Sequence, residues 1–421
     1  MPEISLEDFR AEAKAFLDAN APLKVDDDKP FVWGEGPDDA ALFEEVDREK
    51  EEQDLAEAKA WRAKRYDAGF AYISGPAKYG GRELPNSYER AYNELEGRYD
   101  VPNQSFFGIG LGMVAPTIKD HATPDVAAEL LPKLYRGDLV GCQLFSEPGA
   151  GSDLASLQAR AERDGDEWVI NGQKVWTSGA QYSDVGEIIC RTDPSLPKHR
   201  GLTGFVVDMH APGVEVRPLR QMTGGANFNE VFFTDVRVPD THRLGDVNDG
   251  WRVALTTLMN ERASIGSGSA GSRSGGGLTR LLAMVSHFGY DDDEVVRDRL
   301  ADLYANTQVL RWNNQRAMDK IKAGQLPGPE MSLAKLALTE NMRRTISIIS
   351  QVLGPKLVAD SGEWGTFSYA QYVLGMPGMA IAGGSDQVLR NIVSERVLGL
   401  PKEPGIDTTS PFKELKVGTQ A

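Results

Sequence analysis

The chain has 421 residues, of which 41% are hydrophobic and 26% charged, as in an ordinary globular protein large enough for two or three structural regions. Its net charge of −16 argues against nucleic acid and anionic membrane as partners, because both are recognised through basic surfaces. The N-terminus is acidic, and no apolar run reaches the roughly 18 residues of a membrane helix, so we expect no signal peptide, no membrane span and a cytoplasmic protein.

Helical hydrophobic spacing dominates the first third of the chain. The first helix should begin at Ser5, because Ser5 and Asp8 form a capping arrangement ahead of apolar residues on one face. A later, highly charged helix carries Trp61 on its buried side. The expected order is a helix over 5–20, a long loop over 22–45, a helix over 46–68, a segment broken by Gly and Pro over 69–85, and helical patterning over 86–135.

From residue 139 the period changes to short runs rich in β-branched and aromatic residues, separated by Gly, Pro, Asn and Asp. Such runs predict an all-β block of about 100 residues. The runs are Leu139–Phe145, Glu167–Ile170, Asp184–Cys190, Gly204–Val207, Gly213–Val216 and Val231–Val238. Cys142 and Cys190 lie within them, form no C-x-x-C motif and make no metal-like cluster with the five histidines. We interpret both as reduced thiols and expect no metal site.

Helical spacing returns after Pro239, with helices expected over 249–266, 276–287, 293–322, 330–354 and 384–398. The order of helices, strands and helices predicts an α+β fold. We expect an N-terminal helical domain over 1–138, a central β-domain of barrel or sandwich type over 139–240, and a C-terminal helical bundle over 241–421.

Two segments of the predicted β-domain carry the chemistry. Ser146–Asp153 reads S-E-P-G-A-G-S-D, where a strand ends in a turn whose glycines let backbone approach a ligand closely. Asn171–Ser178 reads N-G-Q-K-V-W-T-S and adds a large indole and a further hydroxyl. Together they indicate a flat, polar-edged cofactor, although the same residues also fit a hairpin turn beside a core tryptophan.

The two segments resemble the flavin-binding signature of the acyl-CoA dehydrogenases. Further matches follow in family order along nearly the whole chain, at Tyr79–Gly81, Leu131–Lys133, Glu230–Phe233, Val236–Pro239 and Glu395–Pro401. The resemblance implies the acyl-CoA dehydrogenase fold, FAD as cofactor, an acyl-CoA substrate and a part in fatty acid β-oxidation. It also implies electron-transferring flavoprotein as the electron acceptor.

The resemblance also assigns roles to single residues. Ser146 would hydrogen-bond the pyrimidine edge of the flavin, Trp176 would pack against its ring, and Ser178, where threonine is common, would reach N5. Ser152 would face the pantetheine part of the acyl-CoA. The other positions implied to bind FAD are Phe145, which replaces an aliphatic residue, and Gly151, Gln351, Ser385 and Gln387, while Arg262 is a second implied substrate contact.

The reaction requires a carboxylate to remove the proton α to the thioester carbonyl. The commoner family position for this base falls on Gly383, so the base is missing there. Asp386 is a poor substitute, because it begins a helix where its charge can serve the helix terminus.

A second family position, used by branched-chain and long-chain members, lies in the helix after the β-domain and falls on Glu261. Ala254, Leu258, Glu261 and Ile265 have the spacing of one helix face, and a glutamate on an apolar stripe is unfavourable unless paired or functional. We therefore expect Glu261 to be the base. The alternative is an ion pair between Glu261 and Arg262.

The chain departs from the family where a neighbouring subunit reaches the flavin diphosphate. Val285 stands at the position of the usual arginine, and Gln351–Pro355 keeps the first of two usual glycines. Two explanations stay open: a homodimer or homotetramer in which Arg273 or Arg280 substitutes, or a heteromer whose other subunit supplies the arginine.

Three classes of function follow from these residues. The first is an acyl-CoA dehydrogenase that forms a trans-2-enoyl-CoA. The second is an acyl-CoA oxidase or flavin monooxygenase on the same scaffold, and the third is a flavin-free or partner subunit of a heteromeric enzyme. The acyl group, a fatty acyl chain or a steroid side chain, is left open.

Overall fold

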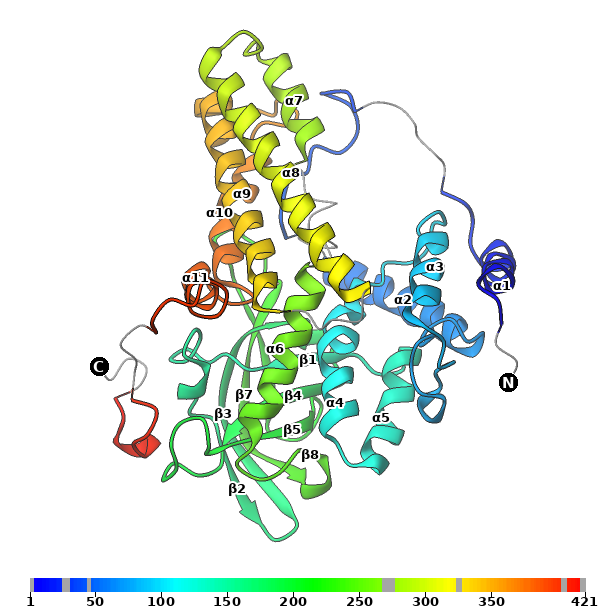
Figure 1. Cartoon of the computed structure of the whole chain (residues 1–421), viewed down its shortest axis with the longest axis vertical. Coiled ribbons are helices and arrows are strands. Elements are labelled where there is room, and N and C mark those ends of the chain that lie inside the picture. The colour runs from blue at the N-terminus through cyan, green and yellow to red at the C-terminus, as the bar shows by residue number, and fades with distance from the viewer. Residues whose placement is uncertain are drawn as a thin grey trace.

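The computed structural model describes residues 4–24, 31–43, 47–266, 277–322, 328–402 and 407–416, without the side chains of 262–266 and 321–322. Helices precede and follow one sheet, as predicted, and a long helical bundle stands on one end of it (Figure 1). Across these residues, no helix is both long and apolar enough to cross a membrane.

The N-terminal helices pack beside the sheet. Helix α1 begins as predicted: the Ser5 hydroxyl accepts a hydrogen bond from the Asp8 amide, and Phe9 is fully buried. The segment predicted as helical over 86–135 is interrupted by the non-helical residues 97–104 and by a capped restart at Thr123. Between these breaks, a π-helical stretch, Gly110–Val114, leads directly into α4. The helices are α1 (Leu6–Asn20), α2 (Arg48–Asp67), α3 (Asn86–Glu96), α4 (Ala115–His121) and α5 (Pro124–Arg136).

Eight strands of the described chain form one mixed sheet in the order β6-β7-β3-β2-β4-β5-β8, with β1 paired in parallel to β4. The strands are β1 (Gly141–Leu144), β2 (Arg160–Asp164), β3 (Glu167–Ser178), β4 (Val185–Arg191), β5 (Leu202–Asp208), β6 (Val214–Leu219), β7 (Phe228–Pro239) and β8 (Arg243–Leu244). The charged β2 was not predicted. It pairs with β3 through a tight turn in which Gly165 has a positive φ of 67°.

The two faces of the sheet bury different clusters. Along β4, Val185 and Ile189 pack with α4, α5 and α6, whereas Ile188 and Cys190 join a core formed by β1, β2, β3, β5 and β7. Strands from distant positions in the sheet share this second core, so the sheet curves around it. Cys142 and Cys190 are both free and buried in β-structure, as predicted.

The C-terminal helices are α6 (Gly250–Gly266), α7 (Leu278–His287), α8 (Glu294–Lys322), α9 (Ser332–Leu353), α10 (Tyr369–Ile381) and α11 (Asp386–Arg396). Helix α10 was not predicted, because Gly375, Pro377 and Gly378 mask its helical pattern. Tertiary packing overrides these residues: Tyr369, Tyr372 and Met376 are buried against α7, α8 and α9.

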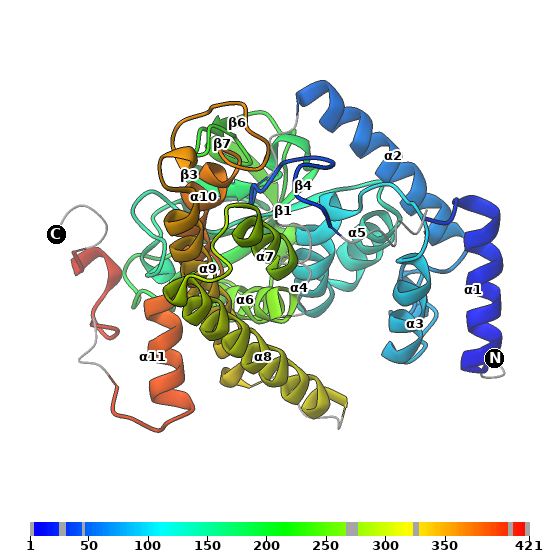
Figure 2. The same ribbon diagram turned by 90° about the horizontal axis from the view of Figure 1, so that it is seen from above.

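The predicted loop over 22–45 is confirmed where it is described, and residues 31–43 reach across to the bundle (Figure 2). The ring of Trp33 lies 5.0 Å from that of Trp364, and the Arg280 guanidinium donates to the backbone oxygens of Asp38 and Asp39 at 2.6 and 2.8 Å. The segment therefore ties the N-terminal part of the chain to the bundle.

Candidate functional site

The turn that follows β1 is closed by its own backbone. The amide of Glu147 donates to the oxygen of Ala150, and the amide of Ala150 donates back to that of Glu147. The oxygen of Ser146 accepts from the amide of Val175, which joins the turn to β3. The two segments singled out from the sequence, Ser146–Asp153 and Asn171–Ser178, are thus adjacent in space.

A buried ion pair fixes this turn from below. Lys174 is fully buried, and its Nζ donates to the Glu147 carboxylate at 2.8 Å and to the oxygens of Phe145 and Ile189. Glu147 also accepts from the amides of Gln158 and Ala159 at 2.6 and 2.9 Å. Breaking such a pair strands a buried charge, at a typical cost of about 3–5 kcal/mol.

The sequence interpretation assigned no role to this pair. The available signal was weak: Glu147 comes two positions after the predicted strand Leu139–Phe145, and Lys174 is a charged residue beside the apolar Val175 and Trp176.

Trp176 lies where the pairing of β3 with β7 is irregular, between Lys174 and Thr177. Its φ is +63°, an unfavourable conformation for a bulky side chain, and 58% of its surface is exposed. The indole contacts Phe228 edge to face, with ring centroids 5.9 Å apart. A bulge that turns a large aromatic ring outward is typical of a binding site and excludes the alternative of a core tryptophan.

The other predicted site residues of the β-domain differ in which of their atoms can contact a ligand. Ser146 and Ser178 are half-buried, and Ser178 pairs with Phe228 across β3 and β7. A Cβ on Gly151 would meet nothing within 4 Å, so the space beside it is open. Phe145 is 5% exposed and belongs to the core, which leaves its backbone as the part that can reach a ligand.

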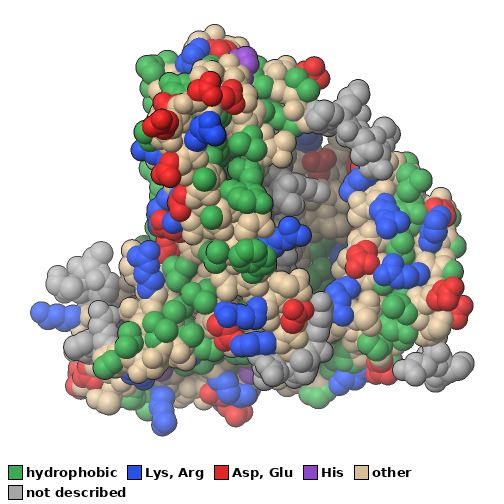
Figure 3. All heavy atoms as spheres, turned by 45° about the horizontal axis from the view of Figure 1, so that its top comes forward, with side chains coloured by type: hydrophobic (Ala, Val, Ile, Leu, Met, Phe, Trp, Pro, Cys, Tyr) green, Lys and Arg blue, Asp and Glu red, His purple; other side chains and the backbone are tan. Residues whose placement is uncertain are grey.

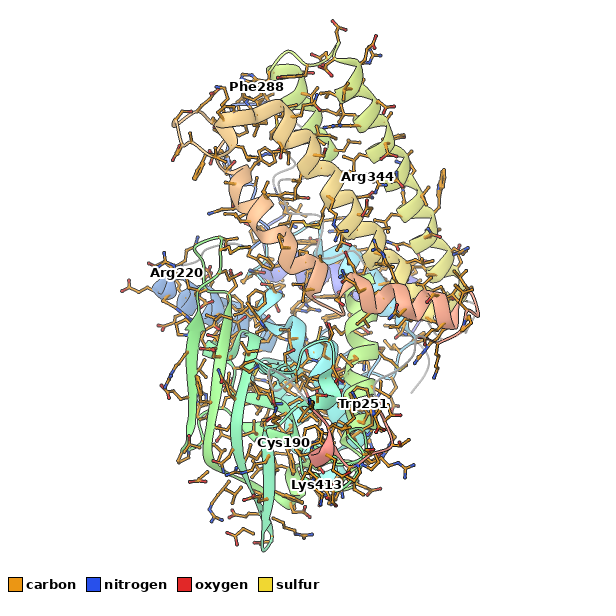
Figure 4. All side chains as sticks on the ribbon, turned by 90° about the vertical axis from the view of Figure 1, so that its left-hand side faces the viewer. Cys190, Arg220, Trp251, Phe288, Arg344 and Lys413 are labelled. Carbon is orange, nitrogen blue, oxygen red and sulfur yellow. The ribbon has the colours of Figure 1, made fainter. Side chains whose placement is uncertain are left out.

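The junction between α10 and α11 meets the β-domain turn. Gly383 and Gly384 both have positive φ, and Ser385 then caps α11 by accepting from the amide of Val388 at 3.3 Å. The hydroxyl oxygens of Ser152 and Ser385 lie 3.5 Å apart. Gln387 is exposed in the first turn of α11. Predicted site residues from the sheet and from the bundle are therefore brought together here, between the sheet and the bundle that stands above it (Figure 4).

Asp386 anchors this junction. Its carboxylate is buried and accepts from Lys335 Nζ at 2.9 Å, Thr339 Oγ1 at 3.0 Å and Arg343 Nη2 at 2.6 Å. Burial raises the pKa of Asp386, but the hydrogen bonds from Lys335, Arg343 and Thr339 outweigh it and lower the pKa below the usual value. An ionised carboxylate with three partners holds α11 against α9 and is poorly suited to accept a further proton.

Glu261 lies on the face of α6 that the spacing predicts. Ala254 is fully buried, Leu258 packs against the same core, and Glu261 is half-buried. Helix α6 packs on β5 and α4 and reaches α9 of the bundle. The side chains of Arg262 and Ile265 lie outside the described residues, so the predicted substrate contact of Arg262 stays a prediction.

The remaining predicted residues lie at the far end of the bundle, which Phe288 marks in Figure 4. The Gln351 side chain accepts from Arg299 at 2.7 Å there, so the single chain does not bring it to the junction. Val285 is buried in the bundle core. Of the candidate substitutes for the usual arginine, Arg280 binds Asp38 and Asp39 within the chain, and Arg273 lies outside the described residues.

The surface is hollowed between the bundle and the N-terminal helices (Figure 3). The junction, where Ser152 of the β-domain meets Ser385 of the bundle, is the place at which a ligand would contact both parts. The arrangement offers an outward indole, several hydroxyls, a capped helix start and one half-buried carboxylate on α6.

Comparison with known families gives three matches in chain order. The N-terminal domain of acyl-CoA dehydrogenases matches residues 39–138, the middle domain matches 142–236, and the C-terminal domain matches 248–398. These matches cover most of the sheet, the junction and α6.

Individual proteins that are similar to this chain come from the same family. Acyl-CoA dehydrogenase IpdE1 of Mycobacterium tuberculosis is 35% identical over 364 residues, which are 84% of this chain and 91% of that protein. Acyl-CoA dehydrogenase FadE34 of the same organism is 41% identical over 288 residues, 68% of this chain but 39% of that relative, so the chain spans well under half of it. The solved structure of the Tcur3481-Tcur3483 steroid ACAD has a TM-score of 0.69 and 26% identity, covering 96% of this chain and 99% of that one.

Proposed function

The chain belongs to the acyl-CoA dehydrogenase family, a family of oxidoreductases that act on acyl-CoA, and on this premise we propose that it converts an acyl-CoA thioester to the trans-2-enoyl-CoA with Glu261 as the base. One observation carries the assignment of the base. Glu261 is a half-buried carboxylate on the inner face of α6, while Gly383 has no side chain and the Asp386 carboxylate already has three partners.

The residues present fit FAD, the family's cofactor. Trp176 presents a strained, outward indole suited to packing on a flat ring, and the half-buried hydroxyls of Ser146 and Ser178 lie near the same strand ends. Ser385 and Gln387 add polar groups from the start of α11. When bound, FAD supplies the acceptor for the hydride that leaves the β-carbon.

The chain's own task is to place a base and exclude water. The Glu261 carboxylate takes the proton from the α-carbon, and the electrons of that C–H bond form the new double bond as the β-hydrogen departs. The buried ion pair of Glu147 and Lys174 holds the Ser146–Asp153 turn in place, and Ser152 at its end is proposed to contact the pantetheine part of the substrate. Preorganisation of this kind is how a protein lowers the barrier without supplying the redox chemistry.

We propose a bulky acyl group as substrate, and a second, different subunit as the neighbour that completes the site. The solved relatives at 25% identity or more include a steroid ACAD of two named components and the ChsE4-ChsE5 complex of Mycobacterium tuberculosis. Val285, buried where the family's arginine is usual, leaves the diphosphate contact to another chain. Reduced enzyme would pass its electrons to electron-transferring flavoprotein.

Anaerobic reduction by substrate tests the proposal. The chain, alone or co-expressed with its partner, is loaded with FAD and mixed with a steroid acyl-CoA and with a straight-chain acyl-CoA, while flavin absorbance is followed. Glu261→Gln should slow bleaching by about 10²–10⁴-fold with flavin content unchanged. Glu340→Gln, a half-buried glutamate of α9, is the matched control and should bleach at the wild-type rate.

Two outcomes would overturn parts of the proposal. Bleaching of Glu261→Gln at the wild-type rate would sink the base assignment. Equal or faster reduction by the straight-chain substrate would sink the preference for a bulky acyl group, and rapid reoxidation in air without another acceptor would favour an oxidase.

A further inference from the structure

A second carboxyl group lies beneath α6. Glu187 is in the middle of β4, has no exposed surface, and points to the face of the sheet that α4 and α6 cover, between Val185 and Ile189. Its Oε1 lies 2.5 Å from the hydroxyl of Thr257 on α6. Its Oε2 is buried and has no hydrogen-bond partner within the described part of the chain. An ionised carboxylate in this position would lack most of the hydrogen bonds that a buried charge needs.

The neighbouring hydroxyls form a chain away from Glu187. Thr257 Oγ1 lies 2.9 Å from Thr117 Oγ1 on α4, and the Thr117 hydroxyl donates to the oxygen of Met113 in the π-helical stretch. The path Glu187, Thr257, Thr117, Met113 thus links the sheet to α6 and α4.

Counting protons along this path favours the protonated form of Glu187. The path contains three links, and the two threonine hydroxyls supply one proton each. An ionised Glu187 leaves one link without a proton. A protonated Glu187 donates to Thr257, which donates to Thr117, which donates to Met113, so these three links are filled and all point the same way. The longer contact of Thr257 Oγ1 with the oxygen of Val253, at 3.3 Å, then carries no proton.

Among the described side chains, no cation contacts the Glu187 carboxyl group. On α4, Lys119 and Asp120 pair with each other at the surface, and His121 bonds to Thr256 on the neighbouring position of α6. On α6, Arg252 pairs with Asp249 at the exposed end of the helix.

The strands beside Glu187 also contribute no charge. It is opposite Gln143 on β1 and Val206 on β5, and the thiols of Cys142 and Cys190 lie on the other face of the sheet. Burial, opposed by the Thr257 hydrogen bond alone, raises the pKa of Glu187 to about 8.

We propose that Glu187 is a protonated carboxylic acid at neutral pH that positions α6, and through it Glu261, by way of the Thr257 hydroxyl. The inference rests on the proposed role of Glu261, which follows Thr257 by one helical turn on α6. Glu187 is a positioning residue, because its contacts are with α6 and not with the thioester. Loss of its proton places a negative charge under α6, and the Thr257 hydroxyl is its one described hydrogen-bond partner. Above pH 8 the helix that carries Glu261 is therefore held less firmly against the sheet.

Infrared spectroscopy tests the protonation state without reference to activity. The carbonyl stretch of a buried carboxylic acid should be present in the FAD-loaded protein at pH 7, disappear as the pH is raised past 8, and be missing in Glu187→Gln. A spectrum at pH 7 in which Glu187→Gln removes no carboxylic acid band would overturn the proposal. This readout stands even if Glu261 proves not to be the base.

The pH profile of substrate reduction tests the positioning role. Wild type should lose rate above pH 8, whereas Glu187→Gln, whose neutral amide can still donate to Thr257, should keep its rate to higher pH. Thr257→Val should lose about tenfold in rate across the profile, Thr257→Ser should recover it, and Thr256→Val, on the adjacent position, should change it little. An alkaline limb that is the same in wild type and Glu187→Gln, or a Thr257→Val variant as fast as Thr256→Val, would contradict the role.

Discussion

Each half of the site is anchored by a buried carboxylate that is paired with a cation, but the two anchors differ in their exposure to solvent. On the sheet side, Glu147 is held by Lys174 and two backbone amides, and the lysine side chain is 0% exposed. On the bundle side, Asp386 is held by Lys335 and by Arg343, whose side chain is 40% exposed. The sheet-side pair is therefore enclosed, whereas the bundle-side anchor is buried at Asp386 and Lys335 and reaches solvent through Arg343.

Glu187 makes the difference clearer, because it is a third buried carboxyl group and no cation contacts it among the described side chains. A cation with several hydrogen bonds lets Glu147 and Asp386 be buried, whereas Glu187 is buried as the neutral acid. Ion pairs thus hold the Ser146–Asp153 turn and the junction between α10 and α11, whereas a chain of neutral hydrogen bonds holds α6.

Removing the cation of the sheet-side anchor should have the largest effect on stability. Lys174→Met leaves Glu147 buried without its cation, and we expect the free energy of unfolding to fall by about 3–5 kcal/mol, with loss of bound FAD. Lys133→Met, which breaks an exposed pair with Glu129, should change it by less than about 1 kcal/mol. If urea denaturation gave the same loss of unfolding free energy for Lys174→Met and Lys133→Met, the difference between buried and exposed ion pairs would be contradicted.

Glu187 should give the protein a dependence of stability on pH. Its pKa in the folded state is raised, so its favourable contribution is complete below its ordinary pKa near 4.5 and is lost as the pH rises through about 8. Relative to Glu187→Gln, the wild-type free energy of unfolding should fall by up to about 1.4 kcal/mol per pH unit in this window. Parallel curves for the two proteins from pH 5 to 9 would show that Glu187 titrates normally.

The bundle-side anchor should have a smaller effect. Asp386→Asn removes the charge that Lys335 and Arg343 share, and we expect a loss of about 1–3 kcal/mol in the free energy of unfolding. Because the folded-state pKa of Asp386 is lowered, this contribution is present at neutral pH and is lost as the pH falls below the ordinary range of an aspartate. A loss equal to that of Lys174→Met would show that exposure of Arg343 does not weaken the anchor.

Trp176→Ala should change stability least. The indole is 58% exposed, so its removal should alter the free energy of unfolding by less than about 0.5 kcal/mol, while FAD release becomes faster. Thermal unfolding of the FAD-free protein and flavin release from the loaded protein separate the two effects. A large drop in the stability of the FAD-free protein would show that Trp176 is a core residue after all.

The family, the α+β architecture and the proximity of the two β-domain motifs could be predicted from the sequence, because periodicity and Gly/Pro turns are local signals. Helix α10 and strand β2 could not, since α10 contains Gly375 and Pro377 and β2 is charged, and each is stabilised by contacts distant in sequence. The family resemblance drawn from the motifs is confirmed.

The site was predicted unevenly for the same reason. The hydroxyls of Ser152 and Ser385 lie close together, although the sequence assigned them to different ligands, and both roles stay predictions. The buried carboxyl groups were not recognised as anchors, because the lysine that holds Glu147 is 27 positions away in sequence and the threonine that contacts Glu187 is 70 away. The assignment of Gln351 depends on a neighbouring subunit and stays a prediction.

The most direct test of the central claim is exchange of the substrate α-proton with deuterated solvent, because it reports proton removal separately from hydride transfer. The FAD-loaded protein is incubated anaerobically with a steroid acyl-CoA, or with an analogue whose β-carbon cannot release hydride, and deuterium uptake is measured by mass spectrometry. We predict rapid exchange in wild type and Glu340→Gln, and almost none in Glu261→Gln. Exchange in Glu261→Gln at the wild-type rate would show that another group removes the proton and would contradict the account.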